Sequence, residues 1–211
     1  MNKGDAEIRL IQKFGKGEAN AILRHLQDAQ IELHQAIDRL LNNEPVQYVA
    51  EFAWFYNRKF HVNQNTLIPR PETEELCELI IRNNKNKQPK ILEIGTGSGC
   101  ISITLAAELE NSHILATDID EITLTTAKKN ATELGVSDNI AFVQSNFLLE
   151  FPEIMDWDIV VSNPPYISEF EKENMLLNVL NFEPHHALFA PGEDPLIFYK
   201  RAAELFGDMQ K

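Results

Sequence analysis

Two short segments of the chain carry residue types that can do chemistry, at a spacing that suits it. The first has glycines at alternate positions, 95, 97 and 99, and directly follows an apolar run. Glycines at such a turn let the backbone bend sharply and approach a ligand without an intervening Cβ. The second is Asn163-Pro-Pro-Tyr166, which follows another apolar run. We expect the glycine segment to hold a cofactor and the Asn-Pro-Pro-Tyr segment to hold the group that reacts with it.

The glycine segment and the acid that follows it indicate which cofactor fits. A dinucleotide site typically has the pattern G-x-G-x-x-G, which seats a pyrophosphate on a helix N-terminus, whereas here Cys100 follows G-x-G-x-G. Asp118 ends the next apolar run, and a carboxylate suits the two hydroxyls of a ribose. S-adenosylmethionine has a ribose and no phosphate, so we predict it as the cofactor and S-adenosylhomocysteine as the product. Asp120 is interpreted as the N-cap of the next helix. Glu93 is left open between a cofactor contact and a partner for loop amides.

The Asn-Pro-Pro-Tyr segment indicates transfer to a planar nitrogen. Its two prolines fix φ and remove two N–H donors, which leaves backbone carbonyls without local partners. Asn163 through its side-chain oxygen and Pro164 through its main-chain oxygen can then accept both hydrogens of a substrate –NH₂. Because the nitrogen of an amide or aryl amine is almost non-basic, orienting it toward the methyl group replaces a general base. We predict Asn163, Pro164 and Tyr166 as catalytic residues, with Pro165 completing the substrate site and Tyr166 stacking on the planar group.

Alternating strands and helices must position these two segments. The hydrophobic pattern predicts strands at 90–94, 113–117, 140–144 and 157–162, and helices at 72–81, 98–109, 121–134 and 195–206, the last capped by Asp194. This alternation is typical of an α/β fold with a parallel sheet covered on both faces. In such a fold, the segments that follow the strands lie along one edge of the sheet. Upstream, helical spacing over 5–41 is interrupted at Gly15-Lys-Gly17, and an aromatic-rich hairpin over 52–62 is broken at Asn57-Arg58.

Composition and charge exclude several classes of function. Of the 211 residues, 19 are basic and 32 acidic, a net charge of −13 that opposes binding to a phosphate backbone. No run approaches the roughly 18 apolar residues of a membrane span, so we expect neither membrane association nor direct nucleic-acid binding. The cysteines, Cys77 and Cys100, and the adjacent His185 and His186 have no metal-ligand spacing. We expect no metal, two buried thiols, and a cytoplasmic monomer.

At four segments the chain resembles the HemK/PrmC family of protein-glutamine N5-methyltransferases. The segments are 44–48, 66–74, 93–101 and 163–166, supplemented by 182–184 and 187–188. The resemblance implies methylation of the glutamine in the Gly-Gly-Gln motif of peptide chain release factors, and thus a role in translation termination. It also implies that Gly95, Thr96, Gly97, Ser98, Gly99, Asp118, Phe147 and Asn163 contact S-adenosylmethionine, with Phe147 against the adenine. From the residues alone, Phe147 is equally an ordinary core phenylalanine.

The resemblance covers nearly the whole chain and implies three parts. Residues 1–50 would form a small helical domain that helps to dock the release factor, 51–68 a hairpin linker, and 69–211 a Rossmann-like class I methyltransferase domain. The family's sheet has seven strands, so we expect the last strands to be missing from this chain. Asn146 and Ala50 depart from the family pattern, which usually has aspartate and glycine at these positions.

Three other functions stay open on the sequence. A ribosomal-protein glutamine methyltransferase would use the same motifs with a different docking surface. A nucleic-acid amino methyltransferase of the adenine N6 type shares Asn-Pro-Pro-Tyr but calls for a basic channel, which the composition opposes. An inactive truncated fragment without the last strands would keep cofactor contacts without turnover.

Overall fold

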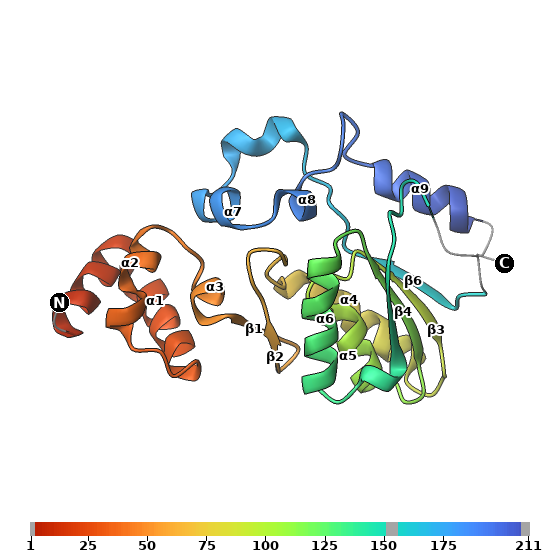
Figure 1. Cartoon of the computed structure of the whole chain (residues 1–211), viewed down its shortest axis with the longest axis horizontal. Coiled ribbons are helices and arrows are strands. Elements are labelled where there is room, and N and C mark those ends of the chain that lie inside the picture. The colour runs from red at the N-terminus through yellow and green to blue at the C-terminus, as the bar shows by residue number, and fades with distance from the viewer. Residues whose placement is uncertain (1–2, 151–155, 208–211) are drawn as a thin grey trace.

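The computed structural model describes residues 3–150 and 156–207, so the outermost residues of the predicted domains 1–50 and 69–211, and 151–155, lie outside the described part. Helices at the N-terminus lead through a hairpin to a parallel sheet, and further helices follow the sheet (Figure 1). Within the described residues, no helix is long and apolar enough to cross a membrane.

The N-terminal helices are α1 (Lys3–Asp28), α2 (Leu33–Leu41) and α3 (Val46–Ala50). Gly15, with φ 78° and ψ 163°, interrupts α1 at the predicted break. Helix α3 is not predicted from the sequence, because Pro45 disfavours continuation of the preceding helical pattern. The fixed φ of a proline, here −56°, is also compatible with the start of a new helix.

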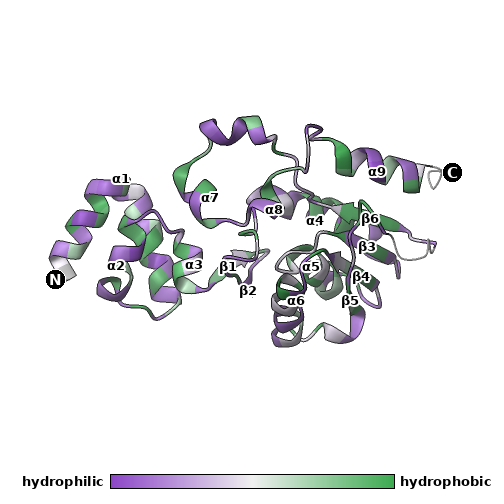
Figure 2. Cartoon of the chain, turned by 45° about the horizontal axis from the view of Figure 1, so that its top comes forward, coloured by the Kyte–Doolittle hydropathy of each residue, from purple (hydrophilic) through white to green (hydrophobic). Residues whose placement is uncertain are grey.

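The same N-terminal helices are amphipathic and bury an apolar cluster of their own. In Figure 2, α1 and α2 show both hydrophilic and hydrophobic colours along their length. The buried members of the cluster are Ala6, Leu10, Ala19, Ile22, Leu26, Leu33, Ala36, Ile37, Leu40 and Val49. The helices therefore pack on one another through their apolar stripes.

The predicted hairpin is formed by the antiparallel strands β1 (Phe52–Phe55) and β2 (Arg58–His61). Its turn lies at Tyr56 and Asn57, one residue earlier than the predicted break at Asn57-Arg58, because Arg58 already pairs with Phe55. Both turn residues have positive φ, 47° and 59°, as expected for a type I′ turn whose twist matches the strands. In Figure 1 the hairpin lies between the N-terminal helices and the sheet.

The sheet confirms the predicted α/β class. Among the described residues it contains β3 (Lys90–Ile94), β4 (His113–Asp118), β5 (Ile140–Gln144) and β6 (Ile159–Ser162), all parallel, in the order β5-β4-β3-β6. Consecutive strands run outward from β3 to β5, and the chain then returns to place β6 on the other side of β3. This reversal is the point in an open α/β sheet where ligands bind, outside the carboxyl ends of the strands.

Helices cover both faces of the sheet, as predicted. Alternate residues of β3 point to opposite faces. Ile91 packs in the cluster shared with α4 (Pro71–Asn84), α5 (Cys100–Glu108) and α6 (Glu121–Glu133). Leu92 packs in the cluster shared with α9 (Ile197–Phe206). Figure 1 shows α9 on the side of the sheet opposite to α5 and α6.

The segment after β6 contains short helices that the sequence analysis does not predict. They are η2 (Glu169–Asn174), α7 (Leu177–Phe182) and α8 (His185–Leu188). Each is too short for a helical period to emerge from the pattern. The predicted helix at 195–206 begins at Ile197, and the prediction that Asp194 caps it is wrong, because Leu196 is the N-cap residue. Asp194 instead accepts a hydrogen bond from the backbone N–H of Leu196 (3.0 Å) in a turn ahead of the helix.

Candidate active site

A cavity of about 440 Å³ opens at the carboxyl ends of the parallel strands, a size typical of small-molecule sites. It brings together residues from the hairpin exit, the glycine segment, the ends of the strands and the segment after β6. Its lining consists of Asn65, Leu67, Ile94, Gly95, Gly97, Thr117, Asp118, Ile119, Thr123, Ser145, Asn146, Phe147, Leu148, Leu149, Asn163, Pro164, Pro165, His186, Ala187, Phe189, Pro191 and Phe198. Both segments singled out from the sequence therefore meet at one cavity.

The glycine segment connects β3 to α5 and presents only part of itself to the cavity. Gly95 and Gly97 line the cavity, whereas Thr96 and Ser98 are buried away from it. Gly97 has φ 57°, so its N–H can turn toward the end of β4 without a Cβ in the way. Gly99 serves packing, since a Cβ there would lie 2.8 Å from Ile103 Cδ1. It precedes α5 as the N-cap residue, which explains why the helix begins at Cys100 and not at residue 98.

Asp118 is the last residue of β4, and its largely buried carboxylate lines the cavity. It accepts hydrogen bonds from the backbone N–H groups of Gly97 (2.9 Å) and Asp120 (3.1 Å). Burial raises the pKa of Asp118 above its usual value, and the bonds from Gly97 and Asp120 oppose this rise. A carboxylate has about four acceptor positions, so two donors leave room for a ligand's hydroxyls.

Asp120 is the N-cap of α6, as predicted. Its side chain accepts a hydrogen bond from the N–H of Ile122 (3.0 Å) and another from the hydroxyl of Thr123 (2.9 Å). These bonds satisfy donors at the start of the helix and hold the segment after β4 in place. The two neighbouring acids thus make different contacts: Asp118 faces the cavity, whereas Asp120 caps α6.

Glu93 lies beneath the glycine segment and does not line the cavity. Its side chain is fully buried, and Oε2 accepts hydrogen bonds from the hydroxyl of Thr96 (2.6 Å) and the N–H of Ser102 (3.1 Å). Burial raises the pKa of Glu93 to about 7. Of the two roles left open by the sequence, this geometry matches a partner for loop donors.

The Asn-Pro-Pro-Tyr segment follows β6 and faces the glycine segment across the switch in strand order. The hydroxyl of Ser162, the last residue of β6, donates to the carbonyl of Ile94 (2.7 Å) and ties the ends of β6 and β3 together. Asn163 and both prolines line the cavity. Tyr166 is 55% exposed and is not part of the lining. The structure thus brings the first three residues of the segment to the cavity and places the fourth on the surface.

Phe147 combines the two interpretations that the sequence leaves open. Its ring is buried in a cluster with Leu92, Ile94 and Trp157, and it also lines the cavity. The neighbouring Asn146 lines the cavity too, and its side-chain oxygen accepts a bond from the N–H of Leu148 (3.1 Å). Phe147 therefore forms an apolar wall that is continuous with the core.

Several lining residues escape the sequence analysis. Asn65 and Leu67 come from the hairpin exit, Thr123 from α6, and His186 from α8. Leu67 belongs to the segment 66–74 that carries the family resemblance, so a signal for it exists in the sequence. His186 offers no such signal, because only the return of the chain over the strand ends brings it near Asp118. Within the residues described, no three His, Cys, Asp or Glu side chains are grouped so that they could hold a metal ion.

Comparison with known proteins shows the class to which this fold and site belong. A family profile described as "Methyltransferase small domain" matches residues 73–201, so the chain belongs to the methyltransferase small domain family. The structure is similar to "hMettl16 catalytic domain in complex with MAT2A 3'UTR hairpin 1", with a TM-score of 0.56 and 25% identity, covering 72% of this chain and 57% of that chain. The predicted fold class is thereby confirmed.

Within this class, the chain is similar to proteins named "Release factor glutamine methyltransferase". The one from Flavobacterium psychrophilum is 46% identical over 79% of this chain, and the one from Bacteroides thetaiotaomicron is 47% identical over 83% of it. The resemblance seen in the sequence is confirmed by these relatives. The chain spans 59% and 63% of their respective lengths.

Proposed function

We propose that this chain carries the site at which a methyl group passes from S-adenosylmethionine to the side-chain nitrogen of a glutamine in the Gly-Gly-Gln motif of release factors. The observation that carries the proposal is the meeting of the glycine segment, Asp118 and Asn-Pro-Pro in one cavity. The names of the relatives, which are 46% and 47% identical, support the choice of substrate.

The residues of the cavity fit the cofactor. Asp118 keeps free acceptor positions for a ribose diol, Gly95 and Gly97 leave space for close backbone approach, and Phe147 offers an apolar wall to an adenine. The other residues of the glycine segment would not contact the cofactor but would hold the shape of the turn; these are Thr96, Ser98 and Gly99. When bound, S-adenosylmethionine supplies an electrophilic methyl group. The cavity also holds Asn163 within its lining, so cofactor and substrate sites would be continuous.

Asn163 and Pro164 would hold the substrate amide. The oxygen of the Asn163 side chain and the carbonyl of Pro164 would accept the two hydrogens of the glutamine –NH₂, so that its nitrogen points into the cavity. These contacts strengthen as positive charge develops on the nitrogen, which stabilises the transition state without prior removal of a proton. The methylated nitrogen then releases one proton to water. Pro165 keeps the segment rigid. Tyr166 would contact the substrate at the rim, where its ring is half exposed.

The division into domains and the choice of partner belong to the same proposal. Residues 1–50 would dock the release factor, 51–68 would link, and 69–211 would carry the reaction. A modifier of release factors would work as a monomer in the cytoplasm, where translation termination occurs. The net charge of −13 disfavours direct nucleic-acid binding.

Transfer of a labelled methyl group tests this proposal. We expect the 211-residue chain to label a release factor and to leave unlabelled the same factor with the motif glutamine replaced by alanine. Equal labelling of both proteins would exclude the glutamine as the acceptor. Stronger labelling of a ribosomal protein would favour a ribosomal-protein glutamine methyltransferase. Stronger labelling of DNA or RNA would favour a nucleic-acid amino methyltransferase. No labelling of any acceptor by the folded chain would refute methyl transfer by this chain.

A further inference from the structure

The segment 66–74, which carries much of the family resemblance, contacts three separate parts of the molecule. Arg70 Nη2 donates to Glu183 Oε1 (2.7 Å) in the segment after α7. Glu74 Oε1 accepts from the N–H of Tyr56 (2.8 Å) in the hairpin turn. Between them, Thr73 Oγ1 accepts a hydrogen bond from Asn163 Nδ2 (3.3 Å). Thr73 is thus the member of the segment that touches the proposed substrate-holding residue.

Thr73 is held firmly on its own side of this contact. It lies in the first turn of α4, and its N–H donates to the carbonyl of Arg70 (3.0 Å). Its side chain is 7% exposed, and a β-branched side chain has few allowed rotamers in a helix. Burial and the two χ1 rotamers of a helical threonine together restrict the position of Oγ1 relative to α4, which begins with Pro71.

Asn163, by contrast, has one torsion that its own backbone does not fix. The bond from Ser162 to Ile94 (2.7 Å) anchors the backbone before Asn163, and Pro164 restricts the backbone after it. The terminal torsion of an asparagine side chain stays broad and roughly two-fold, so the amide can present either its oxygen or its –NH₂ to the cavity. Presenting –NH₂ would oppose donor to donor when the substrate amide arrives.

We propose that Thr73 is a positioning residue that sets the orientation of the Asn163 amide. A hydroxyl can donate as well as accept, so the bond fixes the plane of the amide. With Nδ2 as the donor (3.3 Å), –NH₂ lies on the protein side and the amide oxygen is left for the substrate. This inference rests on the proposed function for its kinetic consequence. Its structural part, the link between Thr73 and the Asn163 side chain, does not depend on which substrate is methylated.

The kinetic experiment compares Thr73→Val with Thr73→Ser in the full 211-residue chain, using a release factor as the methyl acceptor. Valine keeps the shape and removes the hydroxyl, so we expect kcat to fall about 10- to 100-fold. This is less than the roughly 100- to 1,000-fold loss when a transition-state contact is itself removed, because Asn163 stays in place. KM for the release factor and the dissociation constant for S-adenosylmethionine should change less than about threefold. Serine keeps the hydroxyl and should restore most of kcat. An exposed threonine on α6, Thr125, gives the matched control Thr125→Val, which should leave all three constants unchanged.

Unchanged kcat in Thr73→Val would overturn the inference. Equal loss in Thr73→Val and Thr73→Ser would also overturn it, because packing of the methyl group and not the hydroxyl would then matter. Should Thr73→Val fail to fold by circular dichroism, Thr73→Ala takes its place, with the same expectation and the same overturning result.

A nuclear magnetic resonance measurement separates this inference from the proposed function. The two side-chain amide protons of Asn163, assigned by their loss in Asn163→Asp, should shift in Thr73→Val and return near their original positions in Thr73→Ser. If the wild-type chain transfers no methyl group but the Asn163 resonances respond as expected, the proposed function is refuted and the positioning role of Thr73 is not. Amide resonances that do not respond to Thr73→Val would refute the positioning role even in an active enzyme.

Discussion

Glu93 shows how one buried residue supports the glycine segment from below. Its carboxyl group bonds to Thr96 and Ser102 and so joins the turn to the first residues of α5. Within the described part of the chain, its other oxygen, Oε1, has no hydrogen-bond partner. A buried charge with a free oxygen is costly, which explains why burial raises the pKa of Glu93 to about 7.

This raised pKa predicts a pH-dependent stability. Because the pKa of Glu93 is raised from 4.5 in the unfolded chain to about 7 in the folded one, the folded state binds more protons between these values. The stabilisation is therefore complete below about pH 4.5 and is lost as the pH rises through 7, up to about 3 kcal/mol in total.

Replacing the carboxyl with an amide should remove this dependence. Glu93→Gln keeps an acceptor for Thr96 and Ser102 but does not titrate, so its stability relative to the wild type should increase from pH 5 to pH 8. Urea unfolding of both proteins at the two pH values measures the difference. A constant difference between them would show that Glu93 does not titrate in this range.

Asp118 and Asp120 offer a matched pair for testing the ribose contact. We expect Asp118→Asn to weaken S-adenosylmethionine binding by about 1.5–3 kcal/mol, the range for a hydrogen bond to a charged group. Asp120→Asn should not change the affinity, since asparagine is an equally good N-cap. Isothermal titration calorimetry of the two variants measures both effects. If Asp120→Asn bound S-adenosylmethionine more weakly than Asp118→Asn, then Asp120 and not Asp118 would be the ribose contact.

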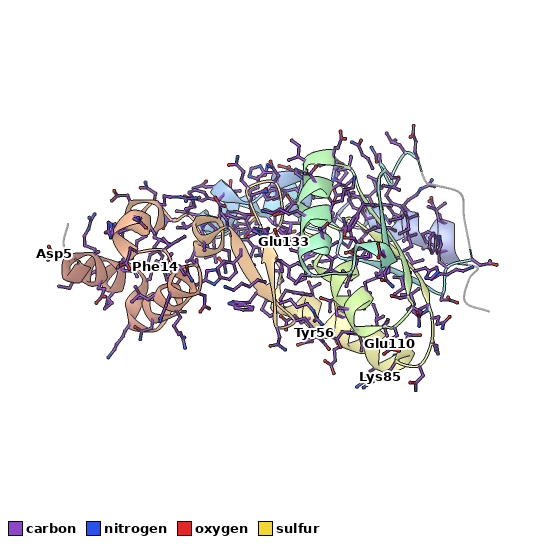
Figure 3. All side chains as sticks on the ribbon, turned by 60° about the horizontal axis from the view of Figure 1, so that its bottom comes forward. Asp5, Phe14, Tyr56, Lys85, Glu110 and Glu133 are labelled. Atoms are coloured by element: carbon purple, nitrogen blue, oxygen red, sulfur yellow. The ribbon has the colours of Figure 1, made fainter. Side chains whose placement is uncertain are left out.

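At the scale of the elements, Asn130 joins three of them at one buried side chain. Its Oδ1 accepts from the N–H of His61 in β2 (2.7 Å). Its Nδ2 donates to the carbonyls of His61 (3.0 Å) and Ser98 in the glycine segment (2.8 Å). Next to this contact, Glu133 of α6, labelled in Figure 3, bonds to the ring of His61 (2.8 Å). The hairpin, α6 and the glycine segment are therefore held in one arrangement.

Removing this side chain should affect both stability and cofactor binding. Asn130→Ala leaves buried backbone groups without partners, so we expect the free energy of unfolding to fall by about 2–4 kcal/mol. Cofactor affinity should also fall, because Ser98 loses the bond that holds the turn. Asn139→Ala is the control, since Asn139 donates to the carbonyl of Ser112 (3.2 Å) away from the cavity. A loss of affinity equal in both variants would mean that general destabilisation explains it. Urea unfolding and calorimetric titration supply the two measurements.

Elements with a strong local pattern are predictable from the sequence. The strands at 90–94 and 140–144 match β3 and β5, and the helix at 121–134 matches α6 to within one residue. The helix at 72–81 is longer at both ends, as α4 runs from Pro71 to Asn84. The strand at 157–162 begins later, at Ile159. The first and last residues of a helix or strand depend on hydrogen bonds to other parts of the fold, and the local sequence pattern does not encode these bonds.

At the scale of the whole molecule, a small third cluster connects α3 to the hairpin, to the segment that follows the hairpin and to α7. Its buried members are Tyr48, Ala53, Val62 and Ile68, with Phe182 packed against them. The Tyr48 hydroxyl donates to the carbonyl of Thr66 (2.7 Å), and Glu183, almost fully buried, pairs with Arg70. Segments that resemble the family at 44–48, 66–74 and 182–184 thus meet in space. These segments therefore hold α3, the hairpin exit and the end of α7 together, in addition to any role at the cavity.

The sequence alone determined the class of chemistry and the type of fold. Positive φ at the glycines, rigid φ at the two prolines and the alternation of strand and helix patterns are local properties, fixed by sterics within a few residues. They were sufficient to predict the glycine turn, the acid at the end of β4 and the rigid Asn-Pro-Pro-Tyr segment after β6.

Only the tertiary structure decided which members of those segments face the cavity. Gly95, Gly97 and Asn163 line it, while Tyr166 lies on the surface. It also decided the contact between Thr73 and Asn163, which are 90 positions apart in the chain. The physical reason is that side-chain direction beyond a turn depends on how whole elements pack. Packing is a property of many distant residues acting together, and no spacing along the chain records it.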